Sequence, residues 1–101
     1  MASMAAYAPL GTMNAYCTSK AAVYMFSDCL RAELAAAGVG LTTICPGVVN
    51  TNIVSATAIH APEGKLTAVS GRRAQLEKMF AARHYGPDKV AKAIVSAVQK
   101  N

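Results

Sequence analysis

Tyr16 and Lys20 stand four positions apart in a segment, from about Asn14 to Ala37, that is rich in helix-forming residues. Residues at this spacing project from one face of a helix, roughly one turn apart. A free phenol has a pKa of about 10, and an ammonium held ~4 Å away at an effective dielectric of ~20 stabilises its anion by about 4 kcal/mol, or roughly 3 pKa units. The spacing therefore predicts a phenol that exchanges protons with an alcohol or carbonyl oxygen near neutral pH.

Ser3 lies upstream of this pair and adds a hydroxyl that could hydrogen-bond the same substrate oxygen. Taken alone, Tyr16 and Lys20 are more typical of an exposed amphipathic pair than of a catalytic one, and a lone serine is weaker evidence still. The joint pattern favours chemistry, because the pair is followed by an alanine-rich helix, Gly38, a β-like run and the sequence Pro46-Gly47-Val48-Val49-Asn50-Thr51.

On these motifs the chain resembles the short-chain dehydrogenase/reductase family, from Ala2 to Ile53 without a gap. More narrowly, it is similar to the reductase domain of mycobacterial proteins that join an epoxide-hydrolase-like domain to a short-chain dehydrogenase. The resemblance implies an α/β fold, the C-terminal part of a Rossmann-like doubly wound parallel sheet. Residues 1–101 would form a partial domain, without the N-terminal dinucleotide-binding βαβ unit and the last strand.

The resemblance also assigns roles to individual residues. Tyr16 would be the proton donor or acceptor, Lys20 would assist it and hold the nicotinamide ribose, and Ser3 would polarise the substrate carbonyl. NAD or NADP would be the cofactor, with Tyr16, Lys20 and a turn after the sixth strand in contact with it. The residues of that turn are Pro46, Gly47, Val49 and Thr51.

The pyrophosphate site of such a fold is missing from the sequence. A Rossmann fold binds pyrophosphate at a glycine-rich turn that precedes a helix, and none of the seven glycines forms G-x-G-x-x-G in that setting. We therefore expect the 101-residue chain to be inactive by itself and to lack measurable affinity for NAD(H) or NADP(H).

Patterning and turn residues predict where the elements lie. Met1 to Met4 would end a strand, Thr12 or Asn14 would cap the 14–37 helix, and Gly38 would stop it. An apolar stripe is expected on that helix, and both of its faces are expected to be covered, one of them by a second subunit in the resemblance. The stripe residues are Val23, Phe26, Leu30 and Leu34.

The remaining elements follow from the same signals. Val39 to Cys45 is typical of a buried parallel strand. Val54 to Ser70 loses periodicity and is expected to be a lid containing His60, a weak candidate for substrate contact. A short helix is predicted over 72–83, and Gly86-Pro87-Asp88 predicts the start of a last helix.

Composition excludes several other classes of protein. Cys17, Cys29 and Cys45 have neither disulfide-framework nor zinc spacing and are expected to be small core residues. No apolar run is long enough to span a bilayer, so a cytoplasmic location is expected. The net charge of +5 is dispersed without interleaved aromatic residues, which argues against nucleic-acid binding.

The sequence thus predicts an oxidoreductase portion that, in an intact protein, transfers hydride between a nicotinamide and a small secondary alcohol or ketone. The expected partner is a second copy, through the 14–37 helix. The alternative is an inactive remnant, or a helix-mediated interaction module without catalysis.

Overall fold

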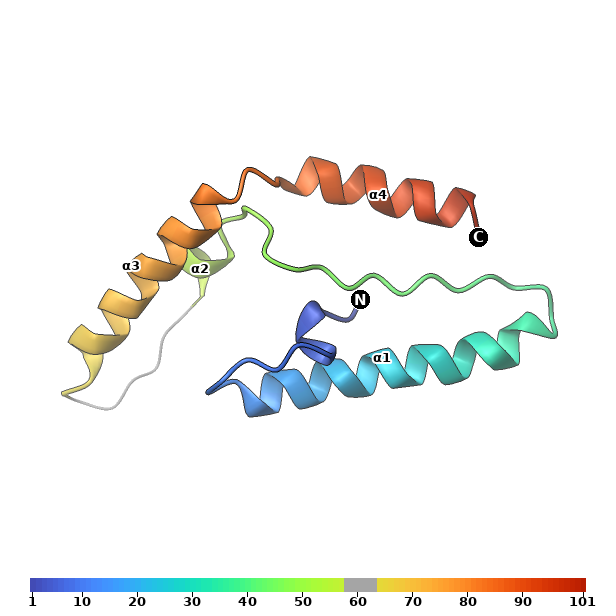
Figure 1. The fold of residues 1–101 in the computed structure, drawn as a ribbon, viewed down its shortest axis with the longest axis horizontal. Helices are drawn as coiled ribbons and strands as arrows, with labels where there is room; N and C mark the ends of the chain where they lie inside the picture. Colours follow the sequence, from blue (N-terminus) through green and yellow to red (C-terminus); the bar gives the residue numbers. More distant parts are fainter. Residues whose placement is uncertain (58–63) are drawn as a thin grey trace. The chain divides into compact units, whose positions relative to one another are not determined.

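The computed structural model describes residues 1–57 and 64–101, and the candidate residue His60 lies outside them. The elements are η1 (Met4–Ala6), α1 (Asn14–Ala35), α2 (Ile53–Ala56), α3 (Leu66–Ala82) and α4 (Pro87–Gln99), drawn in Figure 1. The chain divides into two units: Met1–Gly47 with Ala91–Asn101, and Val48–Val90.

The predicted parallel sheet is wrong for the part of the chain that the structure describes, which contains no strand. Residues 39–46 run as an extended segment beside α1 (Figure 1). Met1 to Met4, predicted as the end of a strand, leads instead into η1. Two backbone hydrogen bonds join these segments, from Ala2 N–H to the Ile44 carbonyl at 2.9 Å and from Met4 N–H to the Pro46 carbonyl at 3.0 Å.

The physical reason is that a strand exists only through its neighbours. A parallel sheet needs several paired strands with helices over both faces. Two hydrogen bonds do not make such a ladder, and the segment predicted as a buried strand is only half-buried between residues 41 and 46. Among the described residues only Ala2 and Ala5 are buried, so these contacts form a small core beside α1.

The start of α1 differs from the prediction, because neither Thr12 nor Asn14 caps it. Met13 occupies the cap position and offers no side-chain hydrogen bond. Thr12 instead takes a left-handed backbone conformation with φ of 68°. The turn that brings the chain into α1 therefore uses the backbone freedom of Thr12 and leaves its hydroxyl out of the cap.

The end of α1 confirms the predicted stop at Gly38, which has φ of 69°. The Gly38 N–H bonds the Ala35 carbonyl at 3.1 Å, and the Val39 N–H bonds the Leu34 carbonyl at 3.1 Å. This pair of bonds is a Schellman motif, which satisfies carbonyls that the helix leaves free. A left-handed residue at this point is what turns the chain from α1 into the extended segment.

Gly38→Ala should therefore destabilise the chain by about 1 to 2 kcal/mol, because an L-residue is strained in the left-handed region. The strain is purely conformational, since a Cβ at Gly38 would meet no atom within 4 Å. Gly11→Ala is the matched control: its Cβ would be equally unhindered, and its backbone is not left-handed. The measurement is urea unfolding followed by circular dichroism, and equal losses in both variants would contradict the motif.

The predicted apolar stripe of α1 is only partly covered. Leu30 and Leu34 are half-buried, whereas Val23 is 38% and Phe26 is 66% exposed. The covered side includes Tyr24, whose ring meets Tyr7 edge-on at 5.7 Å between centroids. Within this chain one face of α1 therefore stays exposed, and its coverage by a second subunit stays a prediction.

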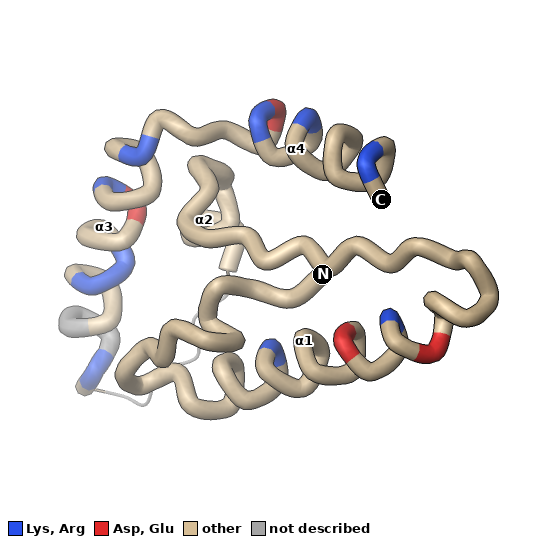
Figure 2. Tube along the Cα trace, turned by 45° about the vertical axis from the view of Figure 1, so that its right-hand side comes forward, with Lys and Arg blue, Asp and Glu red and all other residues tan. Residues whose placement is uncertain are grey.

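The second unit holds α2, α3 and the segments around them. Arg73 on α3 hydrogen-bonds the Ser55 carbonyl at the end of α2 and pairs with Glu77 at 3.3 Å. Helix α3 begins before the predicted 72–83 helix and takes up part of the expected lid. Lys and Arg positions outnumber acidic ones along α3 and at its ends (Figure 2).

Helix α4 confirms the predicted start of the last helix. It begins at Pro87, with Asp88 in its first turn. Proline at the first helical position costs no hydrogen bond, because an N–H group there would have no partner within the helix. A carboxylate near the N-terminus interacts favourably with the helix dipole.

Candidate active site

Helix α1 places Tyr16 and Lys20 on one face in its first turns. The Lys20 ammonium lies 5.7 Å from the centroid of the Tyr16 ring. Tyr16 is 41% exposed and Lys20 is half-buried, so an outside molecule can reach the phenol. The ion pairs found among the described residues are Arg31–Asp28 and Arg73–Glu77, which leaves the Lys20 ammonium free to donate hydrogen bonds.

Ser3 lies on the short segment that packs against α1. It caps η1 by accepting a hydrogen bond from the Ala5 N–H at 3.2 Å. A hydroxyl that accepts a bond still has its own hydrogen to donate, so Ser3 retains a donor for a substrate oxygen. The hydrogen bond that the structure gives Ser3 is thus with η1, and none joins it to Tyr16.

The turn at Pro46 and Gly47 is held against the residue that follows Ser3. The Pro46 carbonyl accepts the Met4 N–H, and a Cβ on Gly47 would lie 2.8 Å from the Met4 sulfur. Only a residue without a side chain fits there unless Met4 moves. Met4 therefore couples Ser3 to this turn, and the sequence carries no signal for that contact because its two sides are far apart along the chain.

Val49 and Thr51, the other predicted cofactor residues, belong to the second unit. Val49 is half-buried, and Thr51 is exposed. The Thr51 hydroxyl accepts the Ile53 N–H at 3.4 Å at the start of α2. Their predicted roles stay predictions.

Tyr7 is a second phenol near the site, and its environment is opposite to that of a general base. Partial loss of water around the phenol raises its pKa above the ordinary 10.0, and the neighbouring Cys45 thiol, by charge and by hydrogen bond, adds to the rise. Tyr24 contributes in the same direction. A raised pKa gives no support for Tyr7 as a general base, and its ring, 60% exposed, packs edge-on against Tyr24.

An open hollow of about 300 Å³ lies between the η1 segment and α1. It is lined by Ala5, Ala6, Tyr7, Pro9, Cys17, Thr18 and Ala21. Because a helix turns 100° per residue, Cys17, Thr18 and Ala21 face a different side of α1 from Tyr16 and Lys20. The hollow is therefore a neighbour of the candidate site and not the space in front of the phenol.

These residues suit one end of a dinucleotide. An ammonium and a phenol on one helix face, with a glycine turn in the same unit, offer donors for sugar hydroxyls and close backbone approach. The sequence contains no glycine-rich turn before a helix that would bind the pyrophosphate of a dinucleotide. No group of three histidine, cysteine or acidic side chains in residues 1–57 and 64–101 could hold a metal ion.

Within the same described ranges, no helix has the length and apolar character needed to cross a membrane. The cysteines are free, and the expectation that they are core residues is wrong, because Cys29 is exposed and the other two are not buried. Cys17 and Cys45 are half-exposed positions beside the η1 segment.

A family model and several similar proteins assign the chain to the same family. The family model described as short chain dehydrogenase matches residues 1–61. "Probable oxidoreductase EphD" of Mycobacterium tuberculosis is 71% identical over 100 residues, which are 99% of this chain and 17% of that protein. No solved structure matches the chain.

Two further relatives carry enzyme names. "Ketoacyl reductase HetN" of Nostoc is 31% identical over 98% of this chain and 29% of its own length. "Estradiol 17-beta-dehydrogenase 2" of Rattus norvegicus is 48% identical over 54% of this chain and 14% of its own length. The chain thus spans a minor part of each of these relatives.

Proposed function

The chain belongs to the short-chain dehydrogenase family, and from that premise we propose that it supplies the acid–base residues of a nicotinamide-dependent oxidoreductase. The observation that carries the proposal is the Lys20 ammonium 5.7 Å from the centre of the exposed Tyr16 ring, on one face of α1. The substrate class is a secondary alcohol or the corresponding ketone.

In this proposal Tyr16 moves the proton. When the alcohol is oxidised, its oxygen loses a proton to the Tyr16 phenolate while its carbon loses a hydride; in reduction both transfers reverse. The positive charge of Lys20 stabilises the phenolate, and the Ser3 hydroxyl donates a hydrogen bond to the substrate oxygen. A bound NAD or NADP would accept or supply the hydride.

The cofactor would meet this chain at its nicotinamide end. Lys20 and Tyr16 would hold the ribose hydroxyls, and the backbone of Pro46, Gly47 and Val49 with the Thr51 hydroxyl would lie beside the nicotinamide. The bonds of Ala2 and Met4 with the Ile44 and Pro46 carbonyls support the placement of the segment that carries Ser3.

A direct test uses the mycobacterial relative that is 71% identical. Its aligned 100 residues are replaced by this chain, and NADH or NADPH oxidation is followed with a panel of small ketones. Ketone-dependent oxidation supports the proposal. A well-folded hybrid that neither binds nor oxidises either nucleotide would count against it.

The alternative is an interaction module that acts through α1 without catalysis. The exposed Met25 and Phe26 side chains favour it, at 61% and 66% exposed, and the same surface would serve the expected self-association of the intact protein. An α1-mediated dimer that persists with no nucleotide turnover in the hybrid would favour this alternative.

The isolated 101-residue chain should show no nicotinamide affinity. The reason is that the sequence has no glycine-rich turn at a helix N-terminus to bind the pyrophosphate, which contributes much of the binding of a dinucleotide. Isothermal titration calorimetry with NADH and NADPH is the measurement, with the hybrid as positive control. Micromolar binding by the isolated chain would refute this expectation.

A further inference from the structure

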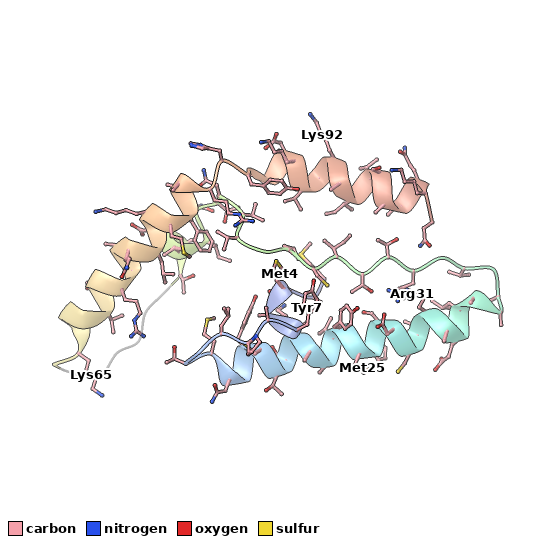
Figure 3. All side chains as sticks on the ribbon, viewed as in Figure 1. Met4, Tyr7, Met25, Arg31, Lys65 and Lys92 are labelled. Atoms are coloured by element: carbon pink, nitrogen blue, oxygen red, sulfur yellow. The ribbon has the colours of Figure 1, made fainter. Side chains whose placement is uncertain are left out.

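Arg31 joins the two parts of the first unit that carry the proposed site. It reaches from α1 towards the extended segment (Figure 3). Its Nε donates to the Leu41 carbonyl at 3.3 Å, and its Nη2 donates to the Thr43 hydroxyl at 3.0 Å. On its own helix, Asp28 accepts a hydrogen bond from the third guanidinium nitrogen.

All three guanidinium nitrogens of Arg31 donate hydrogen bonds. A planar arginine head presents donors in fixed directions, so three partners at once fix its orientation. The Asp28 carboxylate holds the head on α1 while the other two nitrogens hold a segment ten to twelve residues further along the chain. Among the hydrogen bonds of the described residues, these are the side-chain bonds that tie α1 directly to residues 39–46.

The segment that Arg31 holds leads directly to Pro46 and Gly47. At its far end the Pro46 carbonyl is fixed by the Met4 N–H, next to Ser3. The helix that Arg31 belongs to carries Tyr16 and Lys20 in its first turns. The segment 39–46, which leads into the turn, is thus held in its first half through Arg31 and at its end through Met4.

We propose that Arg31 is a positioning residue, which sets the Pro46-Gly47 turn against α1 and so against Tyr16 and Lys20. It touches neither substrate nor cofactor. Because the role of this turn in nicotinamide binding belongs to the proposed function, the inference rests on that function.

The test uses the hybrid described above with three variants. Arg31→Met removes all donors at similar length, and Arg31→Lys retains the charge but not the fork. Leu30→Ala is the stability control, because it truncates a half-buried side chain on the same part of α1 and leaves Arg31, Leu41 and Thr43 unchanged. The dissociation constants of NADH and NADPH are measured by isothermal titration calorimetry. In parallel, pulse alkylation with iodoacetamide and peptide mass spectrometry reports the reactivity of Cys45, with the exposed Cys29 as internal reference.

Arg31→Met should weaken NADH binding on the order of tenfold. It should also raise the alkylation of Cys45 several-fold and leave the alkylation of Cys29 unchanged. Arg31→Lys should fall between Arg31→Met and the parent. Leu30→Ala should lower the unfolding midpoint but leave the NADH dissociation constant near that of the parent.

Equal weakening of NADH binding by Arg31→Met and Leu30→Ala would overturn the positioning role, because stability alone would then explain both. If the parent hybrid binds neither NADH nor NADPH, the proposed function is rejected. In that case Cys45 alone decides the placement of the segment, and unchanged Cys45 alkylation in Arg31→Met would reject the inference as well.

Discussion

Tyr16→Phe in the hybrid should lower the turnover number by on the order of 10³-fold but weaken NADH binding only a few-fold, because Lys20 still holds the ribose hydroxyls. The substitution removes one hydroxyl and keeps the ring over which the Lys20 ammonium lies. A general acid or base contributes about that factor, equivalent to roughly 4 kcal/mol of transition-state stabilisation. Steady-state kinetics and calorimetry on the same preparation separate the two effects.

Tyr24→Phe is the matched control for this prediction. Tyr24 lies on the same helix and loses the same atom, but its ring packs against Tyr7 and has no part in the proposed chemistry. Its turnover should match that of the parent. Near-normal turnover in Tyr16→Phe, or an equal loss in Tyr24→Phe, would remove Tyr16 from the proton-transfer step.

Lys20→Met should lower turnover by on the order of 10²-fold and should also weaken nicotinamide binding. Methionine keeps an unbranched side chain on α1 but has no charge to stabilise the phenolate and no donors for the ribose. Both effects are expected because Lys20 is assigned to the proton-transfer step and to the ribose. A change in nicotinamide affinity with unaltered turnover at saturating cofactor would limit Lys20 to binding.

Local signals in the sequence predicted α1 and the start of α4 well, whereas α2 was not predicted and α3 begins before its predicted start. The 14–37 helix, its stop at Gly38 and the start of the last helix at Pro87 depend on backbone preferences of residues close together in the chain. The cap at Thr12 or Asn14 failed because a chain entering a helix can adopt more than one turn, and here Thr12 takes a left-handed conformation. Helix propensity does not choose among these turns.

The sheet could not be predicted from the same evidence. The run from Val39 to Cys45 has strand-forming residues, but pairing is a property of other segments. Among the described residues, the N-terminal segment gives this run one backbone bond, from Ala2 to Ile44, and a second, from Met4, to Pro46 just after it. It therefore remains extended without becoming a strand. β-propensity indicates that a segment can adopt an extended conformation, but it does not indicate which segments will pair with it.

The candidate site divides in the same way. The spacing of Tyr16 and Lys20 was readable because four residues make about one helical turn, and the two side chains do lie together. The contacts of Met4 with Gly47 and of Arg31 with Thr43 join distant positions, so no local pattern reveals them. A single arginine on a largely apolar helix was the one available sign that Arg31 has a partner.

The account depends most on Tyr16 and Lys20 acting as a unit, and a double-variant cycle on turnover of the hybrid at saturating cofactor tests this directly. If Lys20 promotes turnover through the Tyr16 phenolate, Tyr16→Phe combined with Lys20→Met should be no slower than Tyr16→Phe alone. Losses that simply multiply would show that the two residues act independently and would contradict the account.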